Sequence, residues 1–190
     1  MPLCLCADIE RIATRTRVLV VMHRHETFKT SGTARLALKM LVSSSHAVRG
    51  EPFVVPEGRR LLLYPTPHAR LLTREDAADD VILVVPDGSW AQARRIAQRD
   101  PACRDAEAVM LPEASSRYGL RRKPRDGTLC TLEAIAHALA ILEGDAVKDT
   151  MLDALDRFVE RMRFLRGQRL SSDRERLTPL SAEKVSSNDA

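Results

Sequence analysis

The chain lacks the long apolar segments that a membrane protein needs. None of the apolar runs in its 190 residues approaches the roughly 20 residues required to cross a bilayer. Residues 1–4 carry no charged region followed by a long apolar one, so we expect no signal peptide. These absences predict a cytoplasmic protein without a membrane partner.

Cysteine is scarce, and its four copies follow no disulfide or zinc pattern. Cys4 and Cys6 form a C-x-C pair, whereas Cys103 and Cys130 lie far along the chain. A structural zinc site needs four ligands, and the sequence has no C-x-x-C pair to add to Cys4 and Cys6. The spacing favours buried or free thiols in a reducing compartment, and we expect no metal.

Glycine-rich phosphate-binding motifs are absent as well. Neither G-x-G-x-x-G nor G-x-x-x-x-G-K-[ST] follows an apolar run, which argues against a dinucleotide-binding Rossmann site and a P-loop. The net charge of +4 and the sequence pI near 9.1 are mildly basic. They suggest a nucleic-acid partner without requiring one.

What the chain does contain is an alternation of apolar runs and helix-forming stretches. Because strands that alternate with helices and are apolar on both faces are typical of α/β proteins, we expect a mainly parallel sheet with helices on both faces. One domain over 1–166 and a polar, flexible tail over 167–190 are predicted. Strands are predicted over 17–22, 60–65, 81–85 and 108–111, and helices over 33–41, 90–99, 128–142 and 146–166.

The turn after the apolar run 81–85 is the first candidate site. Asp87 and Ser89 follow the carboxyl end of a predicted parallel strand, which is where open α/β sheets bind ligands. A structural interpretation fits the spacing equally well. Ser89 and Gln92 form an S-x-x-Q capping box, so Ser89 would only cap a helix. Asp87 would then order the turn, and Trp90 would be a core residue.

Two other loops carry hydroxyl groups or cations. The loop over 23–35 precedes a predicted helix, and such a helix N-terminus suits an anion. Its structural interpretation is a solvated loop whose Ser or Thr caps the helix. The loop over 115–127 holds five cations in nine residues together with Tyr118. It fits either RNA phosphate contacts with Tyr118 stacked on a base, or a solvated surface loop.

Four stretches, in this order, resemble the motifs of one family. They are residues 23–26 with 29–35, residues 63–65, residues 87–90, and residues 121–124 leading into 129–134. Together they resemble the DTW-domain family, the tRNA-uridine aminocarboxypropyltransferases, over nearly the whole chain before the tail. The Asp-x-Thr-Trp of that family is Asp87-Gly88-Ser89-Trp90 here, which keeps the hydroxyl group.

The resemblance implies a fold, a reaction and an acceptor. The fold would be SPOUT-like, with a C-terminal trefoil knot and with S-adenosylmethionine (SAM) held as co-substrate by loops at the carboxyl ends of the strands. The reaction would transfer the 3-amino-3-carboxypropyl group of SAM to N3 of a tRNA uridine, forming 3-(3-amino-3-carboxypropyl)uridine. Three alternatives stay open: a ribosomal RNA acceptor, methyl transfer in the same fold, and a non-catalytic RNA-binding homologue.

The resemblance also implies roles for individual residues. No protein partner is evident from the sequence. An ordinary aspartate is a weak base at neutral pH, so Asp87 would lie in an apolar pocket and accept the N3 proton, or mainly position N3–H. The expected catalytic residues are Asp87, Ser89 and Trp90. The expected co-substrate residues are Leu63, Tyr64, Pro65, Asp87, Gly88, Ser89, Leu129, Thr131 and Glu133. The expected tRNA-binding residues are Lys29, Thr33, Arg35, Arg117, Tyr118, Arg121 and Arg122.

Overall fold

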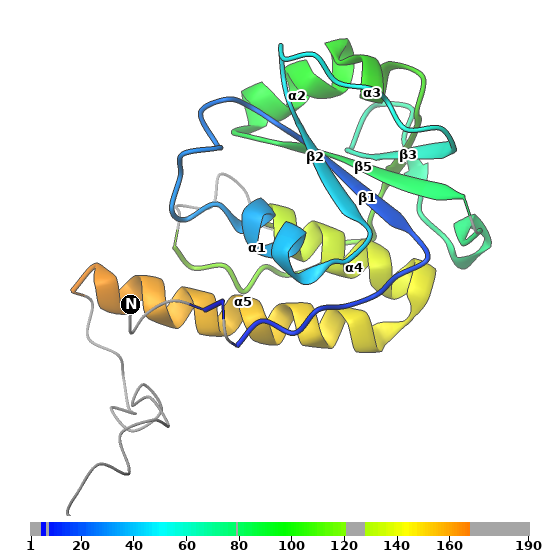
Figure 1. Ribbon diagram of the computed structural model, residues 1–190. Coiled ribbons are helices and arrows are strands. Elements are labelled where there is room, and N and C mark those ends of the chain that lie inside the picture. The colour runs from blue at the N-terminus through cyan, green and yellow to red at the C-terminus, as the bar shows by residue number, and fades with distance from the viewer. Residues whose placement is uncertain (1–4, 7, 79, 121–127, 168–190) are drawn as a thin grey trace, which may run out of the picture.

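A six-stranded parallel sheet forms the centre of the computed structural model, which describes residues 5–6, 8–78, 80–120 and 128–167 (Figure 1). The strands are β1 (Arg17–Met22), β2 (Ser44–Val48), β3 (Arg59–Leu63), β4 (Arg70–Leu71), β5 (Val81–Asp87) and β6 (Glu107–Met110). Their order across the sheet is β2-β1-β5-β3-β6-β4, and every pairing is parallel. The predicted α/β class is confirmed.

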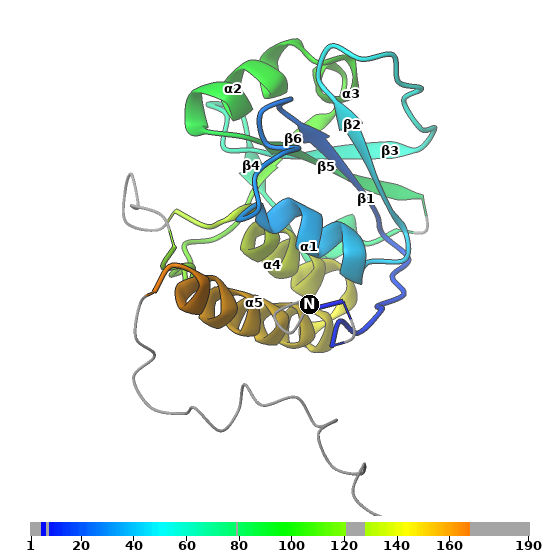
Figure 2. The same ribbon diagram turned by 60° about the vertical axis from the view of Figure 1, so that its left-hand side comes forward.

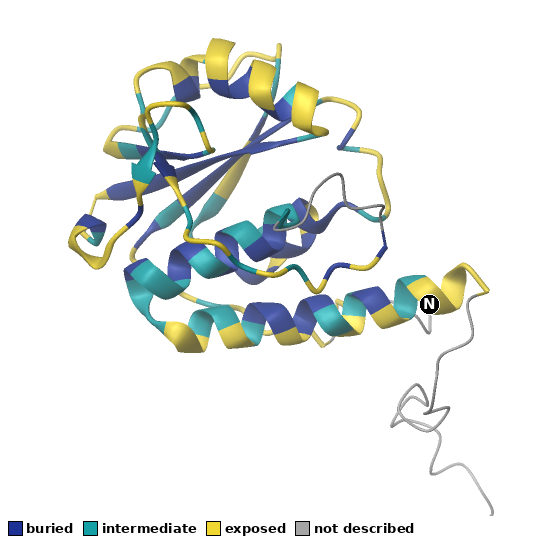
Figure 3. Cartoon of the chain, turned by 180° about the vertical axis from the view of Figure 1, so that it is seen from behind, coloured by how far each residue is buried: buried dark blue, intermediate teal, exposed yellow. Residues whose placement is uncertain are grey.

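Helices cover both faces of this sheet (Figures 1 and 2). One face carries α2 (Trp90–Arg99) and α3 (Pro101–Arg104). The other carries α1 (Thr33–Met40) and α4 (Thr131–Glu143), and α5 (Asp145–Leu165) packs on the outside of α4. Seen from behind, the buried surfaces of α4 and α5 face the interior while their outer turns are exposed (Figure 3).

The central strand explains this layering. All seven residues of β5 are buried, because β1 and β3 flank it and helices cover both of its faces. Its neighbour β1 shows the alternation of a strand with two apolar faces. Val18 and Val20 belong to the core beneath α1, α4 and α5, whereas Leu19 and Val21 belong to the core beneath α2 and α3.

Two edge strands and one short helix were not predicted from the sequence. The edge strand β2 reads Ser-Ser-His-Ala-Val and has only one buried residue, and β4 is two residues long. The helix α3 begins at Pro101, directly after the helix predicted over 90–99, and was not predicted. Asp100 accepts a hydrogen bond from the Ala102 amide and caps α3, so proline sits at a position that helix starts favour.

The remaining boundaries differ little from prediction. The helix predicted over 128–142 begins at Thr131, because residues 128–130 form the approach to its cap. The C-terminal trefoil knot stays a prediction, and the proposed tail beyond 167 lies outside the described residues. Within the residues that the structure describes, we find no helix long and apolar enough to cross a membrane.

Candidate functional site

Two adjoining cavities lie at the carboxyl end of β5. The first has a volume of about 480 Å³ and the second about 400 Å³. The connections that leave β1 and β5 run to helices on opposite faces of the sheet, and such a switch point is where parallel sheets bind ligands. The walls shared by both cavities come from Gly88, Trp90, Thr128, Leu129 and Thr131.

The carboxylate of Asp87 lies in the wall of the first cavity. Asp87 is the last residue of β5 and is only 7% exposed. The hydroxyl of Thr131, at the start of α4, donates a 2.6 Å hydrogen bond to Asp87 Oδ1. Because Thr131 also lines the second cavity, this bond places a buried carboxyl group beside the junction of the two cavities. Asp87 and Thr131, 44 residues apart in sequence, are therefore brought together as predicted site residues.

The structure confirms that Ser89 caps α2, and Ser89 also lines the first cavity. Ser89 Oγ accepts from the Gln92 amide at 3.4 Å, and Gln92 Oε1 accepts from the Ser89 amide at 2.8 Å. Gly88 permits this box, since a Cβ at Gly88 would lie 2.8 Å from the Gln92 Cβ. Both Gly88 and Ser89 line the first cavity, so the cap and the cavity wall are one turn.

Trp90 is not a core residue. Its side chain is 48% exposed and borders both cavities. Its ring lies 6.1 Å from that of Tyr64, centroid to centroid, at an angle of 49°. Tyr64 lines the second cavity with Leu63 and Pro65, so three residues expected to contact the co-substrate lie together there. Met110, at the end of β6, and residues 111–114 beyond it complete this mostly apolar wall. Sequence reasoning missed them as site residues because they belong to no motif.

A second acidic residue of the first cavity was also missed. Glu26 is 2% exposed and forms an ion pair with Lys29 three residues later. The sequence signal was present, since Glu26 belongs to a motif of the resembled family, but its polar surroundings suggested a solvated loop. The Lys29 ammonium donates a hydrogen bond to this buried carboxylate, and its expected contact with tRNA stays a prediction.

Three helix N-termini converge on the first cavity. Its wall includes Gly32 and Thr33 from α1, Ser89 and Trp90 from α2, and Thr131 from α4. Helix N-termini carry partial positive charge and favour anionic groups. The cavity therefore presents two kinds of polarity, buried carboxylates and positive helix ends. Thr33, expected to contact tRNA, lies inside this wall and not on the outer surface.

Glu133 holds the cavity wall together and is not among the residues that line either cavity. Its Oε1 accepts from the amides of Arg117 and Tyr118, at 2.6 and 3.2 Å. Its Oε2 accepts from the Ser116 hydroxyl at 2.8 Å and from the Cys130 amide at 2.7 Å. Glu133 thus attaches the 116–118 segment to the start of α4, and its expected contact with the co-substrate stays a prediction.

Of the arginines expected to bind tRNA, the structure describes two, and both contact other parts of the protein. The guanidinium of Arg35 donates to the Thr27 carbonyl, and that of Arg117 lies 3.4 Å from Asp156 on α5. Arg121 and Arg122 lie outside the described residues. Tyr118 lines the first cavity, but it is 6% exposed and its hydroxyl donates to the Ser31 carbonyl, so its ring is part of the wall.

The thiol in the first cavity is unsuited to nucleophilic chemistry. Burial, together with the nearby Glu133, raises the pKa of Cys130 to about 12. The protonated thiol therefore dominates at neutral pH. Among the residues that the structure describes, we find no group of three or more His, Cys, Asp or Glu side chains placed to hold a metal ion. Cys4 lies outside them, so the C-x-C pair is not tested.

Comparisons with known proteins agree on one family. The family model described as the DTW domain matches residues 1–163. The chain is 30% identical to tRNA-uridine aminocarboxypropyltransferase 2 of Drosophila melanogaster over 69% of its own length and 58% of the relative's. It is 29% identical to the protein of the same name from Macaca fascicularis, over 80% of its own length and 57% of the relative's. The chain thus spans somewhat more than half the length of these relatives.

One solved structure shares the fold. It is the SAM-dependent rRNA:acp-transferase Tsr3 from Vulcanisaeta distributa, with a TM-score of 0.52 and 17% sequence identity. The match covers 80% of this chain and 84% of the other. The similarity shows that the two chains share their overall fold.

Proposed function

The chain belongs to the DTW domain family, and from this premise we propose that its paired cavities bind SAM and a uridine of tRNA. The reaction is transfer of the 3-amino-3-carboxypropyl group to uridine N3. The observation that carries the proposal is the buried Asp87 carboxylate in the first cavity, beside the apolar second one. This junction is where a donor that is apolar at one end and zwitterionic at the other could meet an acceptor.

The second cavity suits the adenosine half of SAM. Leu63, Tyr64, Pro65 and Leu129 give it a mostly apolar wall, and the exposed Trp90 ring forms part of its rim. Ligand pockets of this size class are predominantly apolar, with few polar groups that fix orientation. An adenine ring can stack against the faces of Tyr64 or Trp90.

The first cavity suits the amino-acid half. The donor carries an ammonium group, a sulfonium group and a carboxylate. The buried carboxylates of Glu26 and Asp87 attract the two cations, and the converging N-termini of α1, α2 and α4 attract the anion. This complementarity holds the zwitterionic end in place, and thereby decides which carbon beside the sulfur faces the acceptor.

In the transfer step, uridine N3 attacks the γ-carbon of the donor. The N3–C bond forms as the C–S bond breaks, and its electron pair neutralises the sulfonium to give methylthioadenosine. The N3 proton leaves to Asp87, or to water while Asp87 orients N3–H. Thr131 keeps the Asp87 carboxylate in one orientation through the 2.6 Å hydrogen bond.

The test is to incubate the purified protein with labelled SAM and either unmodified tRNA or ribosomal RNA, and to analyse the nucleosides by mass. We expect aminocarboxypropyl uridine in tRNA and release of methylthioadenosine. Release of S-adenosylhomocysteine would show methyl transfer, and label only in ribosomal RNA would change the acceptor. RNA binding without SAM binding by calorimetry would identify a non-catalytic homologue.

A further inference from the structure

A third concave site lies at the same edge of the sheet, outside both cavities. It has a volume of about 370 Å³ and is lined by His23, Arg24, Arg49, Arg99 and Asp100, among others. We refer to it as the basic hollow. Its residues come from three places: the loop after β1, the end of β2, and the junction of α2 with α3.

The charge of the basic hollow is strongly one-sided. Three guanidinium groups and one imidazole face a single carboxylate, that of Asp100, which accepts a hydrogen bond from the Ala102 amide. Within the described part of the chain, Arg24, Arg49 and Arg99 form no ion pair with a carboxylate. Arg99 alone could simply stabilise the C-terminus of α2, where cations are favourable. That reason does not apply to Arg24 and Arg49, which come from other elements.

The imidazole in the hollow reports the same excess of positive charge. The pKa of His23 is lowered by burial and by the neighbouring basic side chains of His25, Arg49 and Arg24, while Glu26 acts in the opposite direction. A concave site in which guanidinium groups converge in this way is suited to a phosphate group, which arginine binds through paired hydrogen bonds.

The basic hollow is joined directly to the first cavity by the backbone. The His23 amide donates a 2.9 Å hydrogen bond to the Asp87 carbonyl, and the Arg49 amide donates to the Met22 carbonyl. His23, just after β1, is therefore hydrogen-bonded to Asp87, whose side chain lines the first cavity. Arg49, just after β2, is hydrogen-bonded to the last residue of β1. A strand of nucleic acid that delivers a base to Asp87 would pass its backbone over this edge.

From this juxtaposition we infer that the basic hollow binds a backbone phosphate of the RNA strand that flanks the target uridine. The inference rests on the proposed function, because it takes the first cavity to receive the uracil base. It adds an RNA contact at the junction of α2 with α3, remote in sequence from the 115–127 loop. The acceptor strand would then be held at two places, by its base in the first cavity and by a phosphate in the basic hollow. Such positional contacts set register without reading sequence.

The experiment compares Arg24→Gln/Arg49→Gln with the wild type and with Arg157→Gln/Arg95→Gln. The control removes the same charge from exposed positions on α5 and α2 that do not line the hollow. Binding of unmodified tRNA is measured by fluorescence anisotropy from low to moderate salt, with thermal unfolding as the check of folding. We expect the logarithmic salt slope of the hollow variant to be shallower by about one unit relative to the control. The KM for tRNA should rise about tenfold while the affinity for SAM is unchanged.

Equal slopes for the hollow and control variants would overturn the inference and leave the proposed function standing. A wild type that binds no tRNA at any salt would overturn both. Inorganic phosphate serves as a separate probe, by titration in calorimetry. If the hollow variant loses phosphate binding but keeps the control's tRNA slope, the hollow is a free-phosphate site and the RNA assignment is wrong.

Discussion

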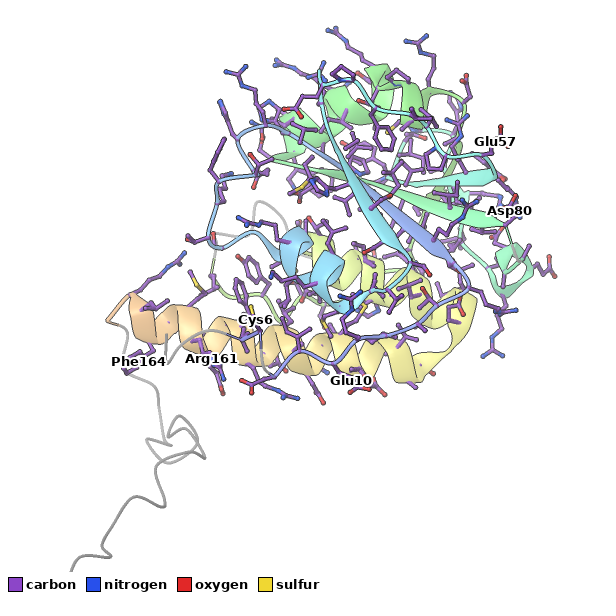
Figure 4. All side chains as sticks on the ribbon, in the orientation of Figure 1. Cys6, Glu10, Glu57, Asp80, Arg161 and Phe164 are labelled. Atoms are coloured by element: carbon purple, nitrogen blue, oxygen red, sulfur yellow. The ribbon has the colours of Figure 1, made fainter. Side chains whose placement is uncertain are left out.

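The two ends of the same parallel strands have opposite characters. At the amino ends, cations and carboxylates are matched: Arg17 lies 2.6 Å from Asp80, and Arg59 and Arg70 lie 2.9 and 2.5 Å from the buried Asp76. Glu57 and Asp80 lie close together at this end (Figure 4), where the Arg17 guanidinium donates to both the Glu57 carbonyl and Asp80. At the carboxyl ends, the cavities and the basic hollow leave polar groups facing open space.

The contacts that stabilise the fold thus lie at one end of the strands, and the candidate site lies at the other. A second carboxylate, Glu107, accepts from Arg59 and Arg70 as well, so β3, β4 and β6 begin in one ion-pair network. Glu143 on α4 similarly accepts from the amide and hydroxyl of Thr16 just before β1. We call the amino ends of the strands, with their ion pairs, the closed end, and the carboxyl ends, with their cavities, the open end. The contacts at the closed end fix the positions of the strands, so the open end can hold charged groups at defined places that remain accessible.

The largest effect is expected at the open end, from Asp87→Asn. The substitution keeps the shape of the side chain and removes its charge and basicity, so transfer should fall by about a hundredfold or more, a range typical of a lost general base. The affinity for SAM should change by less than tenfold. Release of methylthioadenosine measures the first, and calorimetry the second.

Asp153→Asn, an exposed substitution on α5, is the matched control. It should leave both quantities unchanged. Turnover by Asp87→Asn equal to that of the control would remove Asp87 from the mechanism.

The second effect belongs to the closed end. Asp76→Asn leaves Arg59 and Arg70 facing an amide, and we expect a loss of about 2 kcal/mol in the free energy of unfolding, because hydrogen bonds to charged groups are worth about that much. Chemical denaturation measures it. The kcat of transfer by the folded enzyme should not change. Asp80→Asn breaks a pair exposed to solvent and should cost only about 0.5 kcal/mol.

This same network should make the closed end sensitive to acid. The Arg70 hydrogen bond and further donors hold the pKa of Asp76 well below its usual range. A carboxyl whose pKa is lowered by folding stabilises the folded state above its ordinary pKa and loses that contribution as pH falls. The wild type should therefore lose this stability below about pH 4. Asp76→Asn should show a flatter dependence there, and parallel curves for the two proteins would contradict the assignment.

A smaller effect is expected from Trp90→Ala at the cavity rim. The residue is half exposed, so its removal should cost little stability, while the lost stacking surface should raise the KM for SAM about tenfold. Phe164→Ala provides the control, since Phe164 is 53% exposed near the end of α5 (Figure 4). An unchanged KM for SAM in Trp90→Ala would argue against binding of the adenosine half in the second cavity.

The smallest effect is expected from Ser89→Ala. Loss of an N-cap should reduce the free energy of unfolding by about 1 kcal/mol, measured by chemical denaturation. If the hydroxyl also holds the amino-acid end of SAM, the KM for SAM rises as well. Ser89→Thr keeps a hydroxyl group and should restore both quantities, so a KM that stays high in this variant would argue against a role for the hydroxyl.

The sequence predicted the parts of the fold that local pattern controls. Apolar runs such as 17–22 and 81–85 are buried on both faces and therefore stand out. The edge strand β2 consists mostly of polar residues, so no apolar pattern marks it, although it pairs with β1 along its whole length. Asp87 and Ser89 stood out because they follow a buried strand, but this pattern fitted a helix cap equally well. The catalytic roles of Asp87, Ser89 and Trp90 came from the resemblance to the family and stay predictions. The role of Glu133 could not be read from spacing, since its partners Ser116 and Arg117 meet it only in the folded chain.

The attachment of the 116–118 segment to α4 has a consequence for how the family's sequences can vary. Glu133 accepts hydrogen bonds from two backbone amides of that segment, so it sets the path of the backbone there together with the side chains of Ser116 and Tyr118. Neighbouring positions are then free to change identity, and with them the surface offered to an RNA, while the chamber behind them keeps its shape. One buried acid would thus let recognition diverge without disturbing the chemistry.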